Sequence, residues 1–233
     1  MADTLALPDL LQHAGAVMTE RDGRPVPAHY GSAPGELAVC VSSVGLAVRS
    51  DLSVLSVTAS PRCLDRLAER ALGHPLAAGG AALESGAWWC RRADGTELVL
   101  VARHATADRI ARTLRPDASR IANAALVERG DVVLNVIGRR TRPVLDALGA
   151  HGPANDPRSV APFSSGDVLG HRVDWLLEAD VAAMALTDVS SAAAVWQAID
   201  DAGRPSGLSC VGVEAIDRYV LTARAGRSGA TLM

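Results

Sequence analysis

The chain has 233 residues and a mass of 24.1 kDa, enough for one large domain or two small lobes that share an interface. Its formal charge of -3 and its aromatic content of 3% argue against a nucleic-acid-binding protein, because a basic surface and a stacking platform are both missing. All 23 basic residues are arginines, which excludes Schiff-base and Walker-type lysine chemistry.

The four cysteines stand far apart and form no CxxC pair, and no secretory signal precedes them. No apolar run approaches the roughly 18 to 20 residues that a membrane-spanning helix needs. We therefore expect a soluble cytoplasmic protein with no zinc site and no membrane partner.

The first 34 residues predict a short helix at 5–13 and then a turn-rich surface segment, because glycine and proline recur too often for long regular structure. A short helix is expected at 36–42. The extended segments 45–49 and 53–59 follow as a pair joined through Ser50 and Asp51. Pro61 begins a helix with its apolar positions on one face, and Gly73 ends it.

A connection rich in glycine and alanine at 77–82 leads to a predicted hairpin, 86–91 and 97–102, around the turn Ala93-Asp94-Gly95. A helix at 106–114 closes this unit. Later elements are an extended segment at 124–128, a loop at 150–166, a hairpin (171–177 and 181–187), a helix at 190–199 and a strand-and-helix region at 209–225.

One stretch, DVVLNVIGRRTRPVLDALG at 131–149, shows in a single unit the strand, turn and helix that recur at 54–72, 97–114 and 181–199. Because hairpins precede three of these helices, the strands must have antiparallel neighbours. The sequence therefore predicts an α+β fold, with two lobes of antiparallel sheet and helices packed on them. We place the lobes at 1–118 and 119–225, followed by a tail at 226–233.

The common catalytic strings, such as GxSxG, HExxH and GxGxxG, are absent, and no two histidines are paired at helical spacing. The densest charged feature is Arg139, Arg140 and Arg142, where a strand passes into a helix N-terminus. Free backbone N-H groups and guanidinium groups together suit a small anionic ligand, carboxylate or phosphate. The alternative is a solvated charged turn.

Two adjacent tryptophans, Trp88 and Trp89, lie in a predicted strand and must point to opposite faces of its sheet. One of them can be core, and the other needs a helix, a partner or a ligand above it. Trp175, in the later hairpin, is a third large ring in this aromatic-poor chain and a further candidate for ligand stacking.

In order, several segments resemble the aminomethyltransferase family, which includes the glycine cleavage T-protein and the folate-binding portions of sarcosine and dimethylglycine oxidases. These segments are PVPAHYGSAPGELAVCVSSVGLAVRSDLSVLSVTAS near the start, LNVIGRRTRPVLDALG in the middle and AAVWQAIDDAGRPSGLSCVGVEAIDRYV toward the end. The similarity runs over residues 13 to 225. It implies a T-protein-like folate-binding domain in a short form that lacks the family's C-terminal barrel, with tetrahydrofolate as the implied cofactor.

The chain departs from the family's functional positions. The segment GGAALESGAWWC places Ser85 or Gly86 where the family has its one-carbon aspartate, and Glu84 is the nearest carboxylate. The folate signature falls on DWLLEADVAAM, so that Leu177 replaces a tyrosine, Asp180 replaces a glutamate and Met184 replaces the glutamate that holds the pterin.

Two functional hypotheses follow. In the first, the chain is a non-catalytic or accessory subunit of a one-carbon or amine-oxidising system, which holds a protein partner or forms a homo-oligomer. In the second, it is a one-carbon-transfer or related enzyme with a rebuilt site for a small molecule. Glu84 and Asp180 would then be its catalytic carboxylates, and its ligand would contact the tryptophans and arginines named above.

Overall fold

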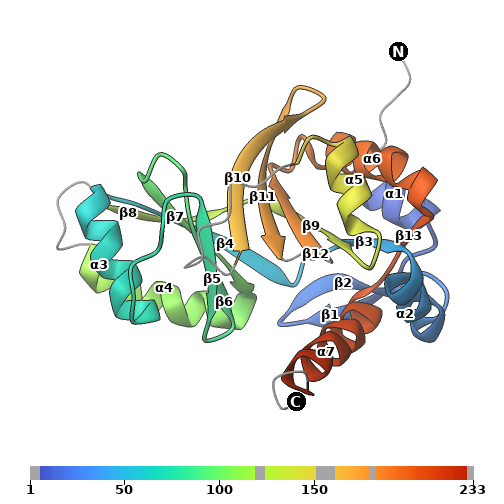
Figure 1. The fold of residues 1–233 in the computed structure, drawn as a ribbon, viewed down its shortest axis with the longest axis horizontal. Helices are drawn as coiled ribbons and strands as arrows, with labels where there is room; N and C mark the ends of the chain where they lie inside the picture. The colour runs from blue at the N-terminus through green and yellow to red at the C-terminus, as the bar shows by residue number, and fades with distance from the viewer. Residues whose placement is uncertain (1–5, 119–123, 151–160, 179–181, 230–233) are drawn as a thin grey trace.

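The computed structural model describes residues 6–118, 124–150, 161–178 and 182–229. In this part of the chain, eleven strands form one curled sheet and two more form a separate hairpin, β1 (Val17–Arg21) with β2 (Arg24–His29). Helices cover the outer faces of the curled sheet (Figure 1). The predicted α+β class is confirmed.

The sheet contains the same series of elements twice. The first series is β4 (Leu52–Thr58), α3 (Pro61–Leu72), β5 (Gly80–Glu84), β6 (Ala87–Arg91), β7 (Glu97–Arg103), α4 (His104–Ala118) and β8 (Ala125–Arg129). The second is β9 (Val132–Ile137), α5 (Thr141–Ala147), β10 (Ala161–Val168), β11 (His171–Glu178), β12 (Ala182–Thr187), α6 (Ala192–Gly203) and β13 (Leu208–Cys210).

The strand order follows this repeat. One half of the sheet runs β8-β4-β7-β6-β5, and the other runs β13-β3-β9-β12-β11-β10, in which β3 (Val44–Val48) is inserted between β13 and β9. The halves join where β5 pairs with β10, through Ala81 with Ala161 and Gly80 with Pro162. Both predicted hairpins, β6 with β7 and β11 with β12, therefore lie in related halves, as expected.

Each half packs helices on one face. Helices α3 and α4 cover the first half over a core that contains Trp89 and Leu100. Helices α1 (Leu7–His13), α5 and α6 cover the second half over Trp175 and Trp196. The opposite faces of the two halves meet in a third apolar cluster, built around Trp88 and Phe163.

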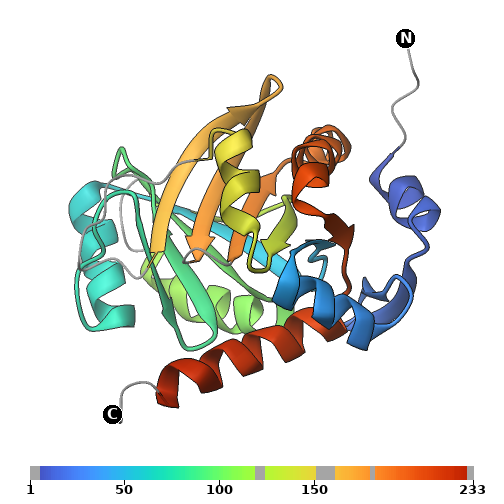
Figure 2. The same ribbon diagram turned by 45° about the vertical axis from the view of Figure 1, so that its right-hand side comes forward.

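Two further helices pack against each other beside the second half. Helix α2 (Ala33–Ser42) lies along α7 (Val213–Gly229), as Figure 2 shows, and together they bury Cys40 and Ile216 against β3 and β9. A short 3-10 turn (Arg204–Ser206) precedes β13.

Three predictions from the sequence were wrong in detail. Strands β3 and β4 do not pair with each other: β3 pairs with β9 and β13, whereas β4 pairs with β7 and β8. Strands β5 and β10 lie partly in the segments expected to be connections, because each is paired by distant residues. The turn-rich segment contains the β1-β2 hairpin, which turns at Asp22 and Gly23, both with positive φ.

Strand pairing also crosses the expected lobe boundary near residue 118. Strand β3 comes early in the chain but belongs to the second half of the sheet, and β8 follows the boundary but belongs to the first half. The halves of the sheet therefore do not follow the ranges 1–118 and 119–225.

Candidate functional site

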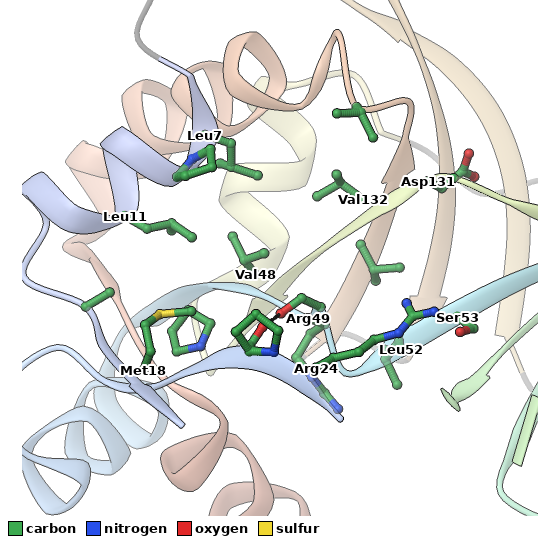
Figure 3. A pocket seen from close by; sticks show the side chains of 18 of the residues that line it. Leu7, Leu11, Met18, Arg24, Val48, Arg49, Leu52, Ser53, Asp131 and Val132 are labelled. Atoms are coloured by element: carbon green, nitrogen blue, oxygen red, sulfur yellow. Dashed lines mark hydrogen bonds between the residues drawn. The ribbon is translucent and has the colours of Figure 1, made fainter. Parts of the chain in front are cut away.

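A cavity of about 810 Å³ lies where the chain crosses between the two halves of the sheet, from β3 into β4 and from β8 into β9. Helix α1 and the β1-β2 hairpin complete its walls. Figure 3 shows Leu7, Leu11 and Met18 toward one side and Ser53 and Asp131 toward the other. Its volume is within the range of small-molecule sites.

Most of the wall is apolar. It is formed by aliphatic side chains and prolines from these four segments and by Val189, which follows β12: Leu7, Pro8, Leu11, Ala16, Met18, Pro25, Pro27, Val48, Leu52, Val132, Val133 and Val189. A few polar and charged groups interrupt this surface on the side of the two crossings. An apolar cavity with a small number of convergent polar groups is the usual form of a ligand site.

The two crossings carry the same short motif. Arg49-Ser50-Asp51 precedes β4, and Arg129-Gly130-Asp131 precedes β9, so that both Arg-x-Asp motifs occupy equivalent positions in the repeat. In each motif the arginine contacts its own aspartate. The environments of the two pairs nevertheless differ.

In the first pair, the arginine and the aspartate are hydrogen-bonded to each other. Arg49 donates from Nε to Oδ1 of Asp51 at 2.8 Å and from Nη2 to Oδ2 at 2.9 Å, and the Asp51 side chain is fully buried. Burial acts to raise the pKa of Asp51, but the hydrogen bonds and charge of Arg49 outweigh it and lower that pKa. Asp51 is therefore a structural carboxylate that stays ionised.

The second pair belongs to a larger buried network. Arg129 lies 2.6 Å from Asp131, 3.2 Å from Asp174 and 3.8 Å from Glu97. Arg92 also contacts Asp174, at 2.7 Å, and Glu97. Two guanidinium groups thus face three carboxylates.

Asp131 is the least satisfied member of this network. Its side chain is 9% exposed, and its Oδ2 is buried; although the atom lies close to Arg129 Nη2, the contact does not have hydrogen-bond geometry. Burial raises the pKa of Asp131 against the opposing effect of Arg129. Of the three carboxylates, Asp131 is the one that lines the cavity.

The remaining polar groups at the rim are paired with one another. Ser53 Oγ lies 2.9 Å from His104 Nδ1 and donates to Glu128 Oε1 at 3.2 Å. Arg24 Nη2 donates to the same Glu128 oxygen, also at 3.2 Å. The rim therefore contains no unpaired arginine among Arg24, Arg49 and Arg129.

The candidate residues expected from the sequence lie elsewhere. Glu84 is exposed at the end of β5, where it accepts a hydrogen bond from Ser85 at 3.0 Å, and Asp180 lies outside the described residues. Trp88, Trp89 and Trp175 are 6%, 5% and 1% exposed. No one of these described residues lines the large cavity.

The adjacent tryptophans point to opposite faces, as predicted, and the protein itself covers both. Trp88 packs between the halves of the sheet and Trp89 packs below α3 and α4. Trp89 also lines a smaller cavity of about 380 Å³, together with Arg70 and Arg109. A role of the tryptophans in ligand binding stays a prediction.

The arginine turn offers fewer donors than expected. The backbone N-H groups of Arg139, Arg140 and Thr141 donate to the carbonyl oxygens of Cys40, Ser43 and Gly138, at 3.1, 2.9 and 3.2 Å. These three groups are therefore not free for an anion.

The side chains of the arginine turn are exposed, and Arg142 donates to Asp146 at 2.8 Å. The guanidinium groups of Arg139, Arg140 and Arg142 stay candidates for binding an anion. Their binding role stays a prediction.

Within the described residues, no three His, Cys, Asp or Glu side chains come together in a way that could hold a metal ion. Of the described helices, none is long and apolar enough to cross a membrane.

No protein-family model matches the chain, and no curated protein sequence matches it. Solved structures do match. The glycine cleavage aminomethyltransferase T of Bartonella henselae has a TM-score of 0.68 at 17% identity, over 91% of this chain and 61% of that chain. This chain therefore spans less than two thirds of the length of that T-protein.

A second match is a chain of the heterotetrameric sarcosine oxidase of Corynebacterium sp. U-96, with a TM-score of 0.53 at 20% identity, over 74% of this chain and 91% of that chain. The expected resemblance is thus confirmed at the level of the fold. This chain has a T-protein-like fold.

Proposed function

We propose that this protein is an aminomethyltransferase-like chain with a degenerate folate site, and that it serves as an accessory, non-catalytic subunit of a one-carbon or amine-oxidising system. The observation that carries this proposal is the packing between the two halves of the sheet. Met184 is 9% exposed there, among Trp88, Phe163 and Leu186.

The residues at the resembling positions do not fit a buried pterin. Met184 offers no carboxylate, and its partner in β9, Asn135, is an amide that already donates to the Ala183 carbonyl oxygen. A pterin whose amine and ring N-H lose their carboxylate partner loses about 1 to 3 kcal/mol per unsatisfied group. Leu177 and Met184 also belong to clusters on opposite faces of the sheet, so they cannot contact the same ligand.

The sarcosine oxidase match supports the subunit role. That chain is matched over 91% of its length, and its protein is described as heterotetrameric, so a chain of this fold and similar size is found in a multi-subunit oxidase. By analogy, we propose a protein partner for this chain.

Two measurements test the proposal. Titration with tetrahydrofolate, followed by tryptophan fluorescence, should show weak binding or none, and a dissociation constant at or below about 1 μM would contradict the degenerate site. Native mass spectrometry of protein purified from its own host should show a stoichiometric partner chain. A species that carries only a small molecule, with no partner, would favour the enzyme instead.

The alternative, an enzyme with a rebuilt site, is favoured by one observation. A buried carboxylate with a raised pKa, Asp131, lines the large cavity, and such groups often act as general acids or bases. Glu84 and Asp180 stay proposals as catalytic carboxylates. Turnover of any substrate found by mass spectrometry distinguishes these carboxylates: loss of activity in Glu84→Gln alone would assign the catalytic role to Glu84, and loss in Asp131→Asn alone would assign it to Asp131.

The arginine turn is the proposed contact for an anionic ligand or partner. Replacing Arg140 and Arg142 with Gln should weaken that binding by more than about 1.5 kcal/mol, the scale of a charge-assisted hydrogen bond, with the melting temperature nearly unchanged. Arg112→Gln, on the exposed side of α4, is the matched control. Loss of stability with binding intact would make these arginines structural.

A further inference from the structure

The large cavity has an uneven charge balance on its polar side. Arg24 pairs with Glu128, and Arg49 pairs with Asp51, so each of these pairs is neutral. In the adjoining network, Arg92 and Arg129 contribute two positive charges, whereas Glu97, Asp131 and Asp174 contribute three negative charges. When all three carboxylates are ionised, one negative charge is left over.

Of the three carboxylates, Asp131 has the fewest hydrogen bonds. Asp174 accepts hydrogen bonds from Arg92, Arg129 and Ser165. Glu97 accepts from Arg92 and Ser56. Asp131 Oδ2, by contrast, is buried without a well-formed hydrogen bond, and Asp131 lines the cavity.

We propose that this cavity binds a small molecule with an apolar body and a protonated amine, and that the ammonium group pairs with Asp131. The aliphatic wall accommodates the body of the ligand. The ammonium group supplies both the missing positive charge and an N-H donor for the unsatisfied carboxylate oxygen.

The same contacts disfavour an anionic ligand. The three arginines of the wall, Arg24, Arg49 and Arg129, already contact carboxylates. An anion would have to break one of these pairs and would also approach the excess negative charge of the adjoining network. A neutral apolar molecule would gain the contacts with the wall but would leave the carboxylate oxygen unsatisfied.

Three probes that share one apolar body separate these cases. Isothermal titration calorimetry at pH 7 compares 4-phenylbutylamine, 4-phenylbutanol and 4-phenylbutyrate, of which the first is a cation, the second neutral and the third an anion. We expect the full-length protein to bind the amine at least about tenfold more tightly than either of the others, equivalent to 1.4 kcal/mol.

The variant Asp131→Asn keeps the shape of the side chain and removes its charge. It should weaken binding of 4-phenylbutylamine about tenfold or more and leave binding of 4-phenylbutanol nearly unchanged. Asp201→Asn makes the same substitution at an exposed carboxylate outside the cavity and is the matched control, in which the affinities should equal those of the wild type. Circular dichroism and thermal melting show that each variant is folded.

Several outcomes overturn the inference. These are equal binding of the three probes by the wild type, tightest binding of 4-phenylbutyrate, no binding of any probe, or an amine preference that persists in Asp131→Asn. The comparison of the three probes on the wild type decides the question even if that variant fails to fold. The inference goes beyond the proposed subunit role, and neither test affects the other, because the tetrahydrofolate titration and the search for a partner do not involve Asp131.

Discussion

Replacing Asp174 with Asn should destabilise the whole protein, because this carboxylate links the two halves of the sheet. Asp174 lies on β11, and Arg92, which follows β6, donates to its two oxygens at 2.9 and 2.7 Å. Ser165 donates at 2.7 Å and Arg129 at 3.2 Å. With 2% of its surface exposed, Asp174 has little solvent to replace these partners.

The expected magnitude follows from this burial. Removing one partner of a buried ion pair costs about 3 to 5 kcal/mol, because the other charge stays buried without compensation. Arg92 keeps Glu97 as a partner, and the new amide can still accept one hydrogen bond. We therefore expect a loss near the lower end of this range, about 3 kcal/mol in the free energy of unfolding.

Urea denaturation at pH 7 measures this loss, and Asp201→Asn is the control, because the pair of Asp201 with Arg204 is exposed and worth about 0 to 1 kcal/mol. Burial acts to raise the pKa of Asp174, but hydrogen bonds from Arg92 and Ser165 outweigh it and lower the pKa. The carboxylate therefore stabilises the fold above the ordinary pKa of Asp, and the difference between variant and wild type should shrink as the pH falls below it. A loss at pH 7 no larger than that of the control would refute the reasoning.

Three further predictions concern single side chains. Burial raises the pKa of Asp131, so the contribution of this side chain to stability should fall as the pH rises above the ordinary Asp pKa, and Asp131→Asn should have the higher urea midpoint at pH 7 but not at pH 3. Gly138→Ala should destabilise by about 2 kcal/mol or more in the same assay, because Gly138 has φ +137° and a Cβ there would lie 2.5 Å from the Ser43 carbonyl oxygen. Cys63 should be the first thiol to react with Ellman's reagent in the folded protein, because hydrogen bonds from Ser60 and Arg66 lower its pKa. Burial raises the pKa of the other three cysteines. Equal reaction rates for all four thiols would contradict this order.

Elements with strong local signals could be predicted from the sequence. Helix α3 begins at Pro61 and ends before Gly73, which has φ +77°, as its apolar spacing and its C-terminal glycine indicated. The β6-β7 hairpin turns around Asp94, whose side chain accepts from the Thr96 backbone. These residues determine their structure within a few positions along the chain.

Elements that depend on distant partners could not be predicted in this way. Strands β5 and β10 are short, and the pairs that join them bring Ala81 against Ala161, which are 80 positions apart in the numbering. Pro25 and Pro27 argued against a strand, yet they lie in β2 of an isolated two-stranded hairpin, where a residue without an N-H group is tolerated. Local composition contains no information on such pairing.

The large cavity escaped prediction for the same reason. Its walls come from α1, the β1-β2 hairpin and the two crossings, and no single one of these segments has a catalytic pattern. One signal was present in the sequence: VRSDLSVLSV and ERGDVVLNVI both place Arg-x-Asp before an apolar strand. A comparison of the chain with itself would have found the repeat and directed attention to the crossings.

The repeat also indicates where function resides, because its two copies have diverged at equivalent positions. At the first crossing, Arg49 serves Asp51 alone, with two hydrogen bonds, and the pair is complete. At the second crossing, Arg129 is shared among several carboxylates, and Asp131 has a buried oxygen without a hydrogen bond. A purely structural role would be met equally well by two complete pairs, and an unsatisfied buried carboxylate lowers stability. Asp131, and not Asp51, borders the cavity. The aspartate that lacks a hydrogen bond therefore lies where a bound ligand could donate one.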